Sequence, residues 1–376
     1  MTEERFTVTL DAAELADLRD RLRRTRWPVG LPGAGWDYGI EAEHLKEVCR
    51  YWAEEYSVEG FLDRVNAHPQ FTREIAGERL HYYHLAAPGS EELPVLVVHG
   101  WPGTVSEMLD VLSPLHEDGR RAVVAPSLPG FGWSAPTTTR GVHVGEMGNR
   151  LAKLMAELGY SRYVVHGGDW GALVATELAA AAPEAVAGLH LTMAPVDAPP
   201  REVRMEGLTD GDRALLGRVG NFVAHESGYE RIQATKPQTL AVGLTDSPAG
   251  LAAWVLEKFH SWTHVDVPRD RQLDVVMTHW FGRTADSAVR LYYETVGPGR
   301  KRPYPAITVP LGYAAFPGEI YPIPRAWIEY AAQLVHFSEQ ERGGHFPAME
   351  VPAQLTADLA TFFAILEAAT PLEKVR

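Results

Sequence analysis

The chain has 376 residues, with 35 Lys and Arg against 49 Asp and Glu, which gives a formal net charge of −14. This balance argues against nucleic acid and anionic membrane surfaces as partners, because both attract basic patches. Cys49 is the only cysteine, so an intrachain disulfide and a cysteine-based metal cluster are excluded. The first residues include early acids and no long apolar run, and we expect a cytoplasmic protein without a signal peptide or a membrane anchor.

Residues 1–92 differ in pattern from the rest of the chain. Asp11 to Arg26 has the spacing of an amphipathic helix that Trp27-Pro28 ends. Phe71 to Leu85 resembles a hairpin that joins the core. A group of arginines in the helix is interpreted as a solvated face that pairs with nearby aspartates, not as a binding site: Arg19, Arg21, Arg23, Arg24 and Arg26.

Residues 93–195 alternate between apolar, β-branched runs and segments with helical spacing. The helical segments are Val144 to Leu158 and Ala172 to Ala182. The apolar runs predict buried parallel strands: Val95–Val98, Ala122–Ala125, Tyr163–His166 and Val186–Leu191. This alternation predicts an α/β fold with a mostly parallel sheet that helices cover on both faces.

The alternation stops for residues 196–305, which are mainly helical in pattern and rich in Trp, Tyr and His. It resumes in residues 306–376 with strands near Ile307–Tyr313 and Leu334–Phe337 and a closing helix from Pro352 to Glu367. A helical insertion of this kind can lie over the carboxyl edge of the sheet, where such folds bind ligands. We therefore expect a helical lid.

Gly167-Gly168-Asp169-Trp170-Gly171 stands directly between a predicted strand and a predicted helix. The pattern is that of a nucleophile elbow, a strained turn that presents its central side chain above the sheet. That residue is Asp169, and without a second G-x-S-x-G a serine esterase or peptidase lacks its nucleophile. A carboxylate can open an activated sp3 carbon and leave an alkyl ester on the enzyme, which an activated water must then hydrolyse.

This fold uses the chain order nucleophile, acid, base. His345, in a glycine-rich loop after the last predicted strand, is the expected base. Glu319 follows the preceding strand and is the preferred partner of His345, with Asp197 and Glu350 as alternatives.

His99-Gly100-Trp101-Pro102-Gly103 follows the strand Val95–Val98. Alone, this block would be a turn punctuated by Pro and Gly. Together with the elbow, it suggests an oxyanion hole made by the backbone N–H groups of Trp101 and Trp170. The hole would stabilise the tetrahedral state that forms when water attacks the ester of Asp169.

With these motifs in order, the chain resembles the microsomal-type epoxide hydrolase family of α/β-hydrolases over essentially its whole length. The resemblance implies that residues 1–92 form an N-terminal meander, that 196–305 form a cap, and that the Trp101-Pro102 bond is cis. It also implies two lid tyrosines that hydrogen-bond the epoxide oxygen. These are assigned to Tyr229 and Tyr292, with adjacent Tyr293 as an alternative to the second.

Microsomal relatives carry an N-terminal membrane anchor, whereas this sequence starts almost at the meander and is similar to soluble bacterial members. The expected substrates are an apolar, aryl-bearing epoxide and water, converted to a vicinal diol with no metal and no organic cofactor. Detoxification and antibiotic biosynthesis are both compatible roles, and a homodimer is left open.

Two other functions are compatible with parts of this pattern. A haloalkane dehalogenase also uses Asp followed by Trp, but it needs N–H donors for a halide where an epoxide needs hydroxyl groups. A non-catalytic binder of a hydrophobic ligand has no use for the complete set of Asp169, Glu319 and His345.

Overall fold

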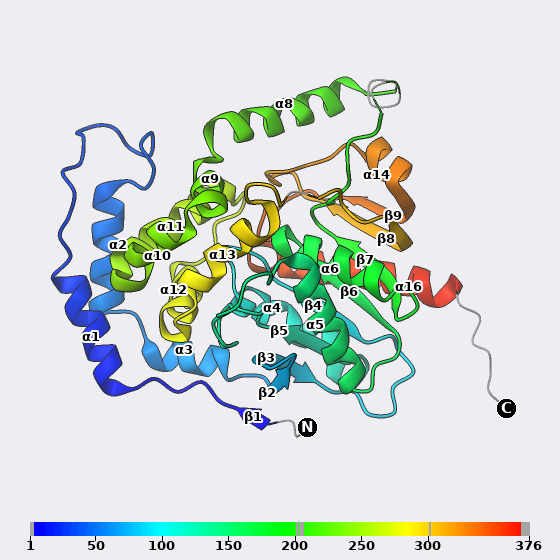
Figure 1. Ribbon diagram of the computed structural model, residues 1–376, viewed down its shortest axis with the longest axis horizontal. Coiled ribbons are helices and arrows are strands. Elements are labelled where there is room, and N and C mark those ends of the chain that lie inside the picture. Colours follow the sequence, from blue (N-terminus) through cyan, green and yellow to red (C-terminus); the bar gives the residue numbers. More distant parts are fainter. Residues whose placement is uncertain (1–3, 201, 203–206, 301, 370–376) are drawn as a thin grey trace.

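A nine-stranded sheet forms the centre of the computed structural model, which describes residues 4–200, 202, 207–300 and 302–369 (Figure 1). Within these ranges the strand order is β1-β2-β3-β5-β4-β6-β7-β8-β9. The strands are β1 Glu4–Phe6, β2 Gln70–Ile75, β3 Glu78–Leu85, β4 Val95–Val98, β5 Val123–Pro126, β6 Tyr163–Gly167, β7 Val186–Leu191, β8 Ile307–Ala315 and β9 Ala332–Glu339. From β5 to β9 all neighbours are parallel, and β1, β2 and β3 add to the β5 edge in antiparallel pairs.

Helices cover both faces of this sheet. They are α4 Leu109–His116, α5 Val144–Glu157, α6 Asp169–Ala181, α14 Arg325–Ala331, α15 Pro347–Glu350 and α16 Pro352–Ala369, with short 3-10 turns at Val105–Met108 (η1) and Glu117–Gly119 (η2). The α5 and α6 helices pack against each other, and α16 packs against α4 and the strands β7 to β9 (Figure 1). Strands β4 to β7 are entirely buried, which accounts for their continuous apolar sequence.

The predicted α/β fold with a mostly parallel sheet is confirmed. The predicted strands lie within two residues of the observed ones, and the predicted hairpin is the β2–β3 pair. Two differences stand out. The helix expected from Ala172 begins three residues earlier, at Asp169. Strand β1 was not predicted, because it has only three residues, two exposed and one half-buried, and they show no alternation.

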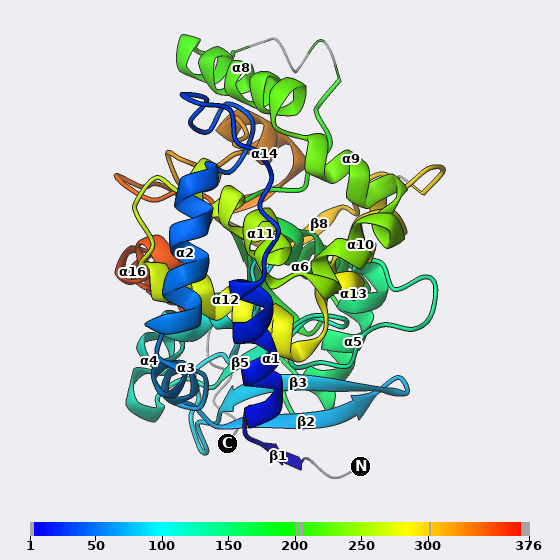
Figure 2. The same ribbon diagram turned by 90° about the vertical axis from the view of Figure 1, so that its left-hand side faces the viewer.

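The N-terminal segment contains α1 Ala12–Arg23, α2 Ala42–Glu54 and α3 Val58–Val65. Asp11 caps α1 by accepting hydrogen bonds from two backbone N–H groups, which explains where this helix starts. In Figure 2, α1 and α2 lie in front of the inserted helices, and both contact α11. Arg21 of α1 pairs with Asp17, as expected for a solvated face, and it also bonds to Asp246 of the insertion.

Six helices make up the described part of the insertion: α8 Asp210–His225, α9 Gly228–Thr235, α10 Pro237–Asp246, α11 Pro248–Trp262, α12 Arg269–Gly282 and α13 Ala285–Val296. In Figure 1, α8 runs along the outside of the molecule while α9 to α13 gather next to the sheet. Within the described ranges no single helix is long and apolar enough to span a membrane, and only α10 with α11, bent by 114°, reach that length as a pair.

A buried carboxylate links the N-terminal segment to the insertion. Asp274 of α12 is fully buried and accepts a hydrogen bond from the Tyr56 hydroxyl at 2.6 Å. It also accepts two hydrogen bonds from Arg64 of α3, both at 2.7 Å, and one from Arg271 at 2.8 Å. The domain boundaries at residues 92, 195 and 305 stay predictions, and the segments 1–92 and 196–305 both include residues outside the described ranges.

Candidate active site

Asp169 lies at the turn between β6 and α6. Its backbone φ of 48° is in the left-handed region, which is strained for a side chain with a Cβ. A Cβ on Gly167 would lie 2.5 Å from the carbonyl oxygen of Gly171, and a Cβ on Gly171 would lie 2.1 Å from that of Val98. Glycine is therefore required at both positions, because the strand and the helix approach each other closely here. The elbow geometry follows directly from this spacing.

His345 lies between two carboxylates. Its Nε2 is 3.2 Å from Oδ2 of Asp169, and its Nδ1 is 3.0 Å from each carboxylate oxygen of Glu319. His345 and Glu319 are almost fully buried, with 3% and 4% of their surface exposed. The structure thus brings together the three side chains that the sequence analysis named as nucleophile, base and acid.

The two alternative partners of His345 lie elsewhere. Glu350 accepts hydrogen bonds from the backbone N–H groups of His264, Val265 and Phe346, so it holds the loops around His345. Asp197 is exposed to solvent and, within the described part of the chain, has no hydrogen bond to His345. The backbone N–H of His345 itself donates to the carbonyl of Trp262 at 3.1 Å, which ties the loop to α11.

The two carboxylates control the protonation of His345. Burial alone would lower the pKa of His345, but the negative charges of Glu319 and Asp169 outweigh burial and raise this pKa well above its ordinary value. In the resting site the imidazole is therefore protonated. Any change that removes the negative charge of Asp169 would therefore lower the pKa of His345 again.

A backbone donor faces the other oxygen of Asp169. The N–H of Trp101 donates to Oδ1 of Asp169 at 2.7 Å, and the bond between Trp101 and Pro102 is cis, as the resemblance implies. The N–H of Trp170 is in the first turn of α6, where backbone donors have no acceptor within the helix. These are the two N–H groups that the sequence analysis expected to form an oxyanion hole.

Two buried tyrosines from the insertion reach the same place. Tyr229 of α9 stacks on Trp101 with ring centroids 5.3 Å apart, and Tyr292 of α13 packs edge-on against Trp170 at 4.5 Å. Burial raises the pKa of both hydroxyls well above the usual value, so both remain proton donors. Tyr293 instead packs under the guanidinium of Arg300. Of the two candidates, only Tyr292 lies beside Asp169.

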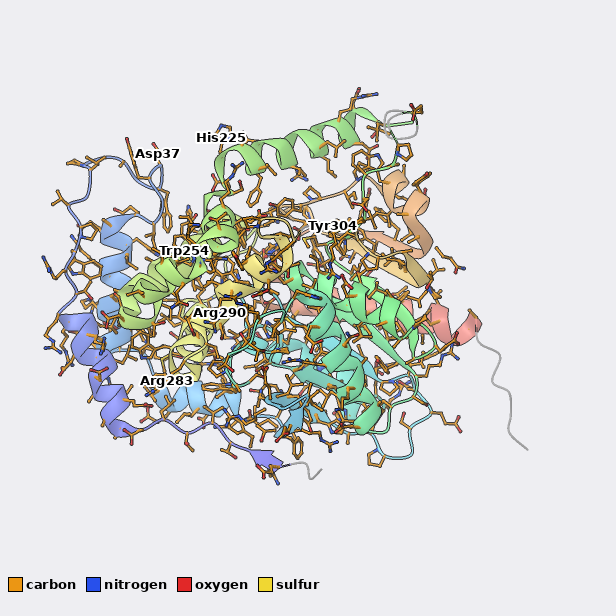
Figure 3. All side chains as sticks on the ribbon, in the orientation of Figure 1. Asp37, His225, Trp254, Arg283, Arg290 and Tyr304 are labelled. Carbon is orange, nitrogen blue, oxygen red and sulfur yellow. The ribbon has the colours of Figure 1, made fainter. Side chains whose placement is uncertain are left out.

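A cavity of about 320 Å³ opens over Asp169, Tyr229 and Tyr292. Most of its remaining wall is aliphatic or aromatic and comes from the chain after β7, from α8 and from the segment after Glu319, including Leu216, Tyr321 and Trp327. Tyr304, labelled in Figure 3 between α8 and the sheet, closes one side. The cavity is suited to a small, mainly apolar molecule, because few polar groups interrupt its wall.

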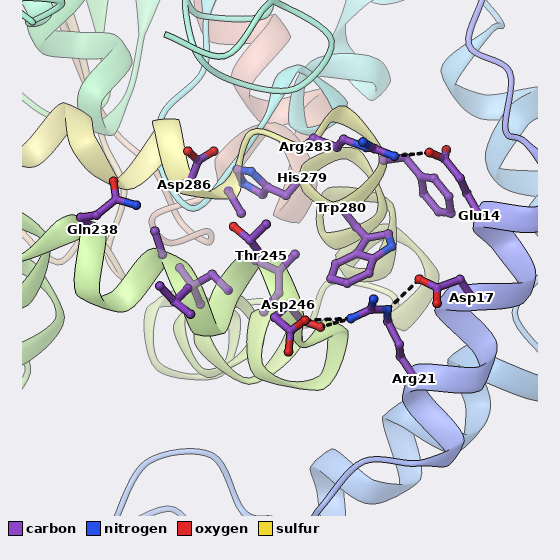
Figure 4. Close-up of a pocket in the computed structure, with 16 residues that line it drawn as sticks. Glu14, Asp17, Arg21, Gln238, Thr245, Asp246, His279, Trp280, Arg283 and Asp286 are labelled. Carbon is purple, nitrogen blue, oxygen red and sulfur yellow. Dashed lines mark hydrogen bonds and ion pairs between the residues drawn. The ribbon is translucent and has the colours of Figure 1, made fainter. Parts of the chain in front are cut away.

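A larger cavity, of about 590 Å³, lies between α1 and the helices α10 and α12 (Figure 4). Among the residues that line it, ion pairs join Arg21 to Asp246 and Arg283 to Glu14, and both connect α1 to the inserted helices. None of the three side chains Asp169, Glu319 and His345 lines this cavity. The larger cavity is therefore not the candidate active site.

Two polar residues near Asp169 were not identified from the sequence. Glu107 of η1 and His166 of β6 are buried and share a small chamber with Asp169 and His345. His166 could have been noticed as a polar residue that ends an otherwise apolar strand, three positions before Asp169. Among the described residues, no group of three or more His, Cys, Asp or Glu side chains is arranged to hold a metal ion.

The site can be compared with known proteins. The epoxide hydrolase N-terminus family matches residues 3–108, and the α/β-hydrolase fold family matches residues 94–219. The chain is 34% identical to epoxide hydrolase 1 of Oryctolagus cuniculus over 405 residues, which cover 96% of this chain and 89% of that protein. It is 32% identical to the juvenile hormone epoxide hydrolase of Bombyx mori over 390 residues, or 94% of this chain and 85% of the relative.

Solved structures agree with these matches. The epoxide hydrolase of Aspergillus niger superposes with a TM-score of 0.90 at 29% identity, covering 98% of this chain and 97% of the other. The juvenile hormone epoxide hydrolase of Bombyx mori gives the same TM-score and identity, covering 98% and 95%.

Proposed function

The chain belongs to the microsomal-type epoxide hydrolase family and is an epoxide hydrolase, and on this premise we propose that it opens apolar, aryl-substituted epoxides through an ester on Asp169. The observation that carries the proposal is the position of Asp169 between two sets of groups. Tyr229 and Tyr292 line the cavity that opens over Asp169. His345, which Glu319 contacts, lies 3.2 Å from Oδ2 of Asp169.

In the first half-reaction, the carboxylate of Asp169 attacks an epoxide carbon and the C–O bond of the ring breaks. Tyr229 and Tyr292 hydrogen-bond the departing oxygen, and one of them transfers its proton to the alkoxide that forms. A hydroxyl group must be a proton donor in the resting enzyme to do this, which agrees with the raised pKa of both tyrosines.

In the second half-reaction, a water molecule attacks the carbonyl carbon of the Asp169 ester. The ester no longer carries the charge that held the proton on His345, so the proton can return to the tyrosinate and free Nε2 to accept one from water. The N–H groups of Trp101 and Trp170 stabilise the oxyanion of the tetrahedral state. When this state collapses, His345 gives its proton to the departing diol. The second proton of the attacking water then passes from the carboxyl group of Asp169 to His345, which restores the carboxylate and the protonated imidazole of the resting site.

The shape of the cavity supports an aryl-bearing substrate. Its wall away from Asp169 is built from Tyr304, Tyr321 and Trp327, together with aliphatic side chains such as Leu216. Aromatic side chains in a cavity wall favour ligands that contain an aromatic ring, because a pair of rings contributes binding free energy beyond that of the apolar area it buries. The proposal therefore places the aryl group of the substrate in this outer part and the epoxide ring at Asp169.

Isotope labelling tests the ester directly. Enzyme in excess over racemic styrene oxide is allowed one turnover in water enriched in heavy oxygen. We expect the label in the Asp169 carboxylate and an unlabelled diol, because water attacks the ester carbonyl. Mass spectrometry of the peptide that contains Asp169 and of the diol measures both. A labelled diol with unlabelled Asp169 would mean that water attacks the epoxide itself.

The tyrosines carry a second prediction. Changing both Tyr229 and Tyr292 to Phe should slow ester formation about 100-fold, because the alkoxide loses its hydrogen-bond donors while the rings still fill the cap. Rapid mixing with styrene oxide, with the alkyl-enzyme measured by intact mass, gives the rate constant. Tyr293→Phe is the matched control and should leave this rate within twofold. Ester formation at the wild-type rate in the double variant would contradict the assignment.

The haloalkane dehalogenase alternative is not supported by the groups around Asp169. A leaving halide needs free side-chain N–H donors. The cavity beside Asp169 is lined by Tyr229 and Tyr292, and the indole of Trp170 there is hydrogen-bonded to the side chain of Tyr292. The complete set of Asp169, Glu319 and His345 likewise argues against a binding protein without catalysis.

A further inference from the structure

A small chamber that is distinct from the substrate cavity adjoins Asp169 and His345. It measures about 10 Å³, close to the size at which a protein cavity holds one water molecule. Besides Asp169 and His345, its polar side chains are Glu107, His166 and Thr192. The chamber is too small for an epoxide that carries an aryl group, so it can serve only water.

The hydrogen bonds of His166 lead away from this chamber into the core. Nδ1 of His166 is 2.9 Å from Nδ1 of His190, and Nε2 of His190 is 2.7 Å from Oδ2 of Asp358 on α16. The other oxygen of Asp358 lies 2.9 Å from Nε2 of His336. Burial alone would raise the pKa of Asp358, but the hydrogen bonds from these histidines outweigh it and lower the pKa, so Asp358 is a carboxylate.

This chain of contacts determines which nitrogen of His166 carries a hydrogen. A carboxylate only accepts, so Nε2 of His190 must donate to Asp358. Burial lowers the pKa of His190. Burial and the neighbouring His190 together lower the pKa of His166 to about 3, so both rings are neutral. Nδ1 of His190 is then an acceptor, and Nδ1 of His166 must donate to it. Nε2 of His166 is left without a hydrogen.

That nitrogen is an acceptor without a partner. Nε2 is on the side of the ring away from His190, and within the described part of the chain no hydrogen bond to it is recorded, while His166 lines the chamber. Glu107 is a weaker competitor for a hydrogen of water, because burial above all, with a contribution from the charge of Asp169, raises its pKa to about 8 and keeps the carboxyl group protonated at neutral pH.

Ester hydrolysis needs such an acceptor. A water molecule that attacks the Asp169 carbonyl directs a lone pair at the carbon, so its two hydrogens must point elsewhere. One goes to Nε2 of His345, which takes it as a proton. The other remains on the oxygen throughout the step and must be hydrogen-bonded if the water is to keep its orientation.

We propose that His166 is a positioning residue for the hydrolytic water, whose second hydrogen it accepts at Nε2, with His190 and Asp358 fixing the tautomer. This inference rests on the proposed Asp169 ester. In this step, the water loses one proton to Nε2 of His345 and its oxygen forms a bond to the carbonyl carbon of the Asp169 ester. The electron pair of the carbonyl double bond moves to its oxygen, which becomes the oxyanion, and His166 neither gains nor loses a proton. His166 therefore acts on ester hydrolysis and not on ester formation.

Two amide substitutions test the contributions of the two ring nitrogens of His166 separately. His166→Asn keeps a polar atom near the Nδ1 position, facing His190, but does not reach the chamber. His166→Gln places an amide near the Nε2 position. We expect His166→Asn to slow ester hydrolysis about tenfold, the effect of one lost hydrogen bond, with the rate of ester formation within twofold of wild type. His166→Gln should restore hydrolysis to within about threefold.

The readout is the rate of ester formation and of ester decay with styrene oxide, followed by intact mass after rapid mixing. In steady state, kcat and KM should fall together in His166→Asn, so that kcat/KM is unchanged. His81→Asn is the matched control: His81 is a fully buried histidine on β3, bonded to Gln70 and Ser127 and absent from the chamber. It should lose stability without changing the ratio of the two rates.

Three outcomes would overturn the inference: wild-type hydrolysis in His166→Asn, equal slowing of both steps, or the same change in His81→Asn. If His166→Asn does not fold, His166→Gln still tests the inference. Equal slowing of ester formation and ester hydrolysis in His166→Gln would also contradict the proposed positioning role. Failure of the proposed function has another signature. In that case no ester accumulates in wild type or in any variant, including His345→Gln.

Discussion

Replacement of His345 by glutamine is expected to leave the enzyme alkylated at Asp169 and to lower turnover about 10⁴-fold, the upper end of the range for a general base. Ester formation does not need His345 as a base, so it should proceed. Hydrolysis does need it, because glutamine cannot accept the proton of the attacking water. The enzyme should therefore stop after one half-reaction, with a mass gain equal to one molecule of epoxide.

Intact mass spectrometry after incubation with styrene oxide measures this, and digestion should locate the added mass on the peptide with Asp169. Two further carboxylate variants serve as a matched pair. Glu319→Gln should also accumulate ester, since Glu319 contacts Nδ1 of His345 at 3.0 Å. Asp197→Asn should not, because Asp197 has no such contact. An unmodified His345→Gln enzyme that turns over at a measurable rate would show that another group activates the water.

The main chemistry of the site was predictable because this fold orders its catalytic residues along the chain. The glycines of the elbow and the position of His345 after the last strand depend on local spacing and on strand order, which the sequence displays. The choice among Glu319, Asp197 and Glu350 could not be made this way. All three follow strands or lie near His345 in sequence, and only the folding of the loops shows that Glu350 bonds to backbone N–H groups instead.

Contacts between distant residues were harder to foresee. His190 and Asp358 are 168 positions apart, and their hydrogen bond exists because α16 packs across β7. Nothing in the local sequence around either residue indicates it. The same holds for Tyr292 and Tyr293, which are adjacent, so only the rotation of α13 determines that Tyr292 reaches the cavity. Long-range packing and the rotation of a helix about its axis are therefore the features of this site that the local sequence does not predict.

Asp274 provides the second large expected effect, on stability. Asp274→Ala should lower the free energy of unfolding by about 3 kcal/mol, because it leaves the guanidinium groups of Arg64 and Arg271 without their shared buried partner. We take the lower end of the range for broken buried ion pairs since 31% of the Arg64 side chain is exposed to water, which partly screens its charge. Tyr56 also loses the acceptor of its hydroxyl.

Urea unfolding followed by tryptophan fluorescence measures the change as a lower midpoint with an unchanged slope. Asp270→Ala is the matched control. Asp270 is on the same helix and also accepts a hydrogen bond from a tyrosine, Tyr51, at 2.7 Å, but it is only half-buried. This variant should lose about 1 kcal/mol or less. Equal losses in the two variants would mean that Asp274 contributes one ordinary hydrogen bond, and that the N-terminal segment is held to the inserted helices mainly by apolar packing.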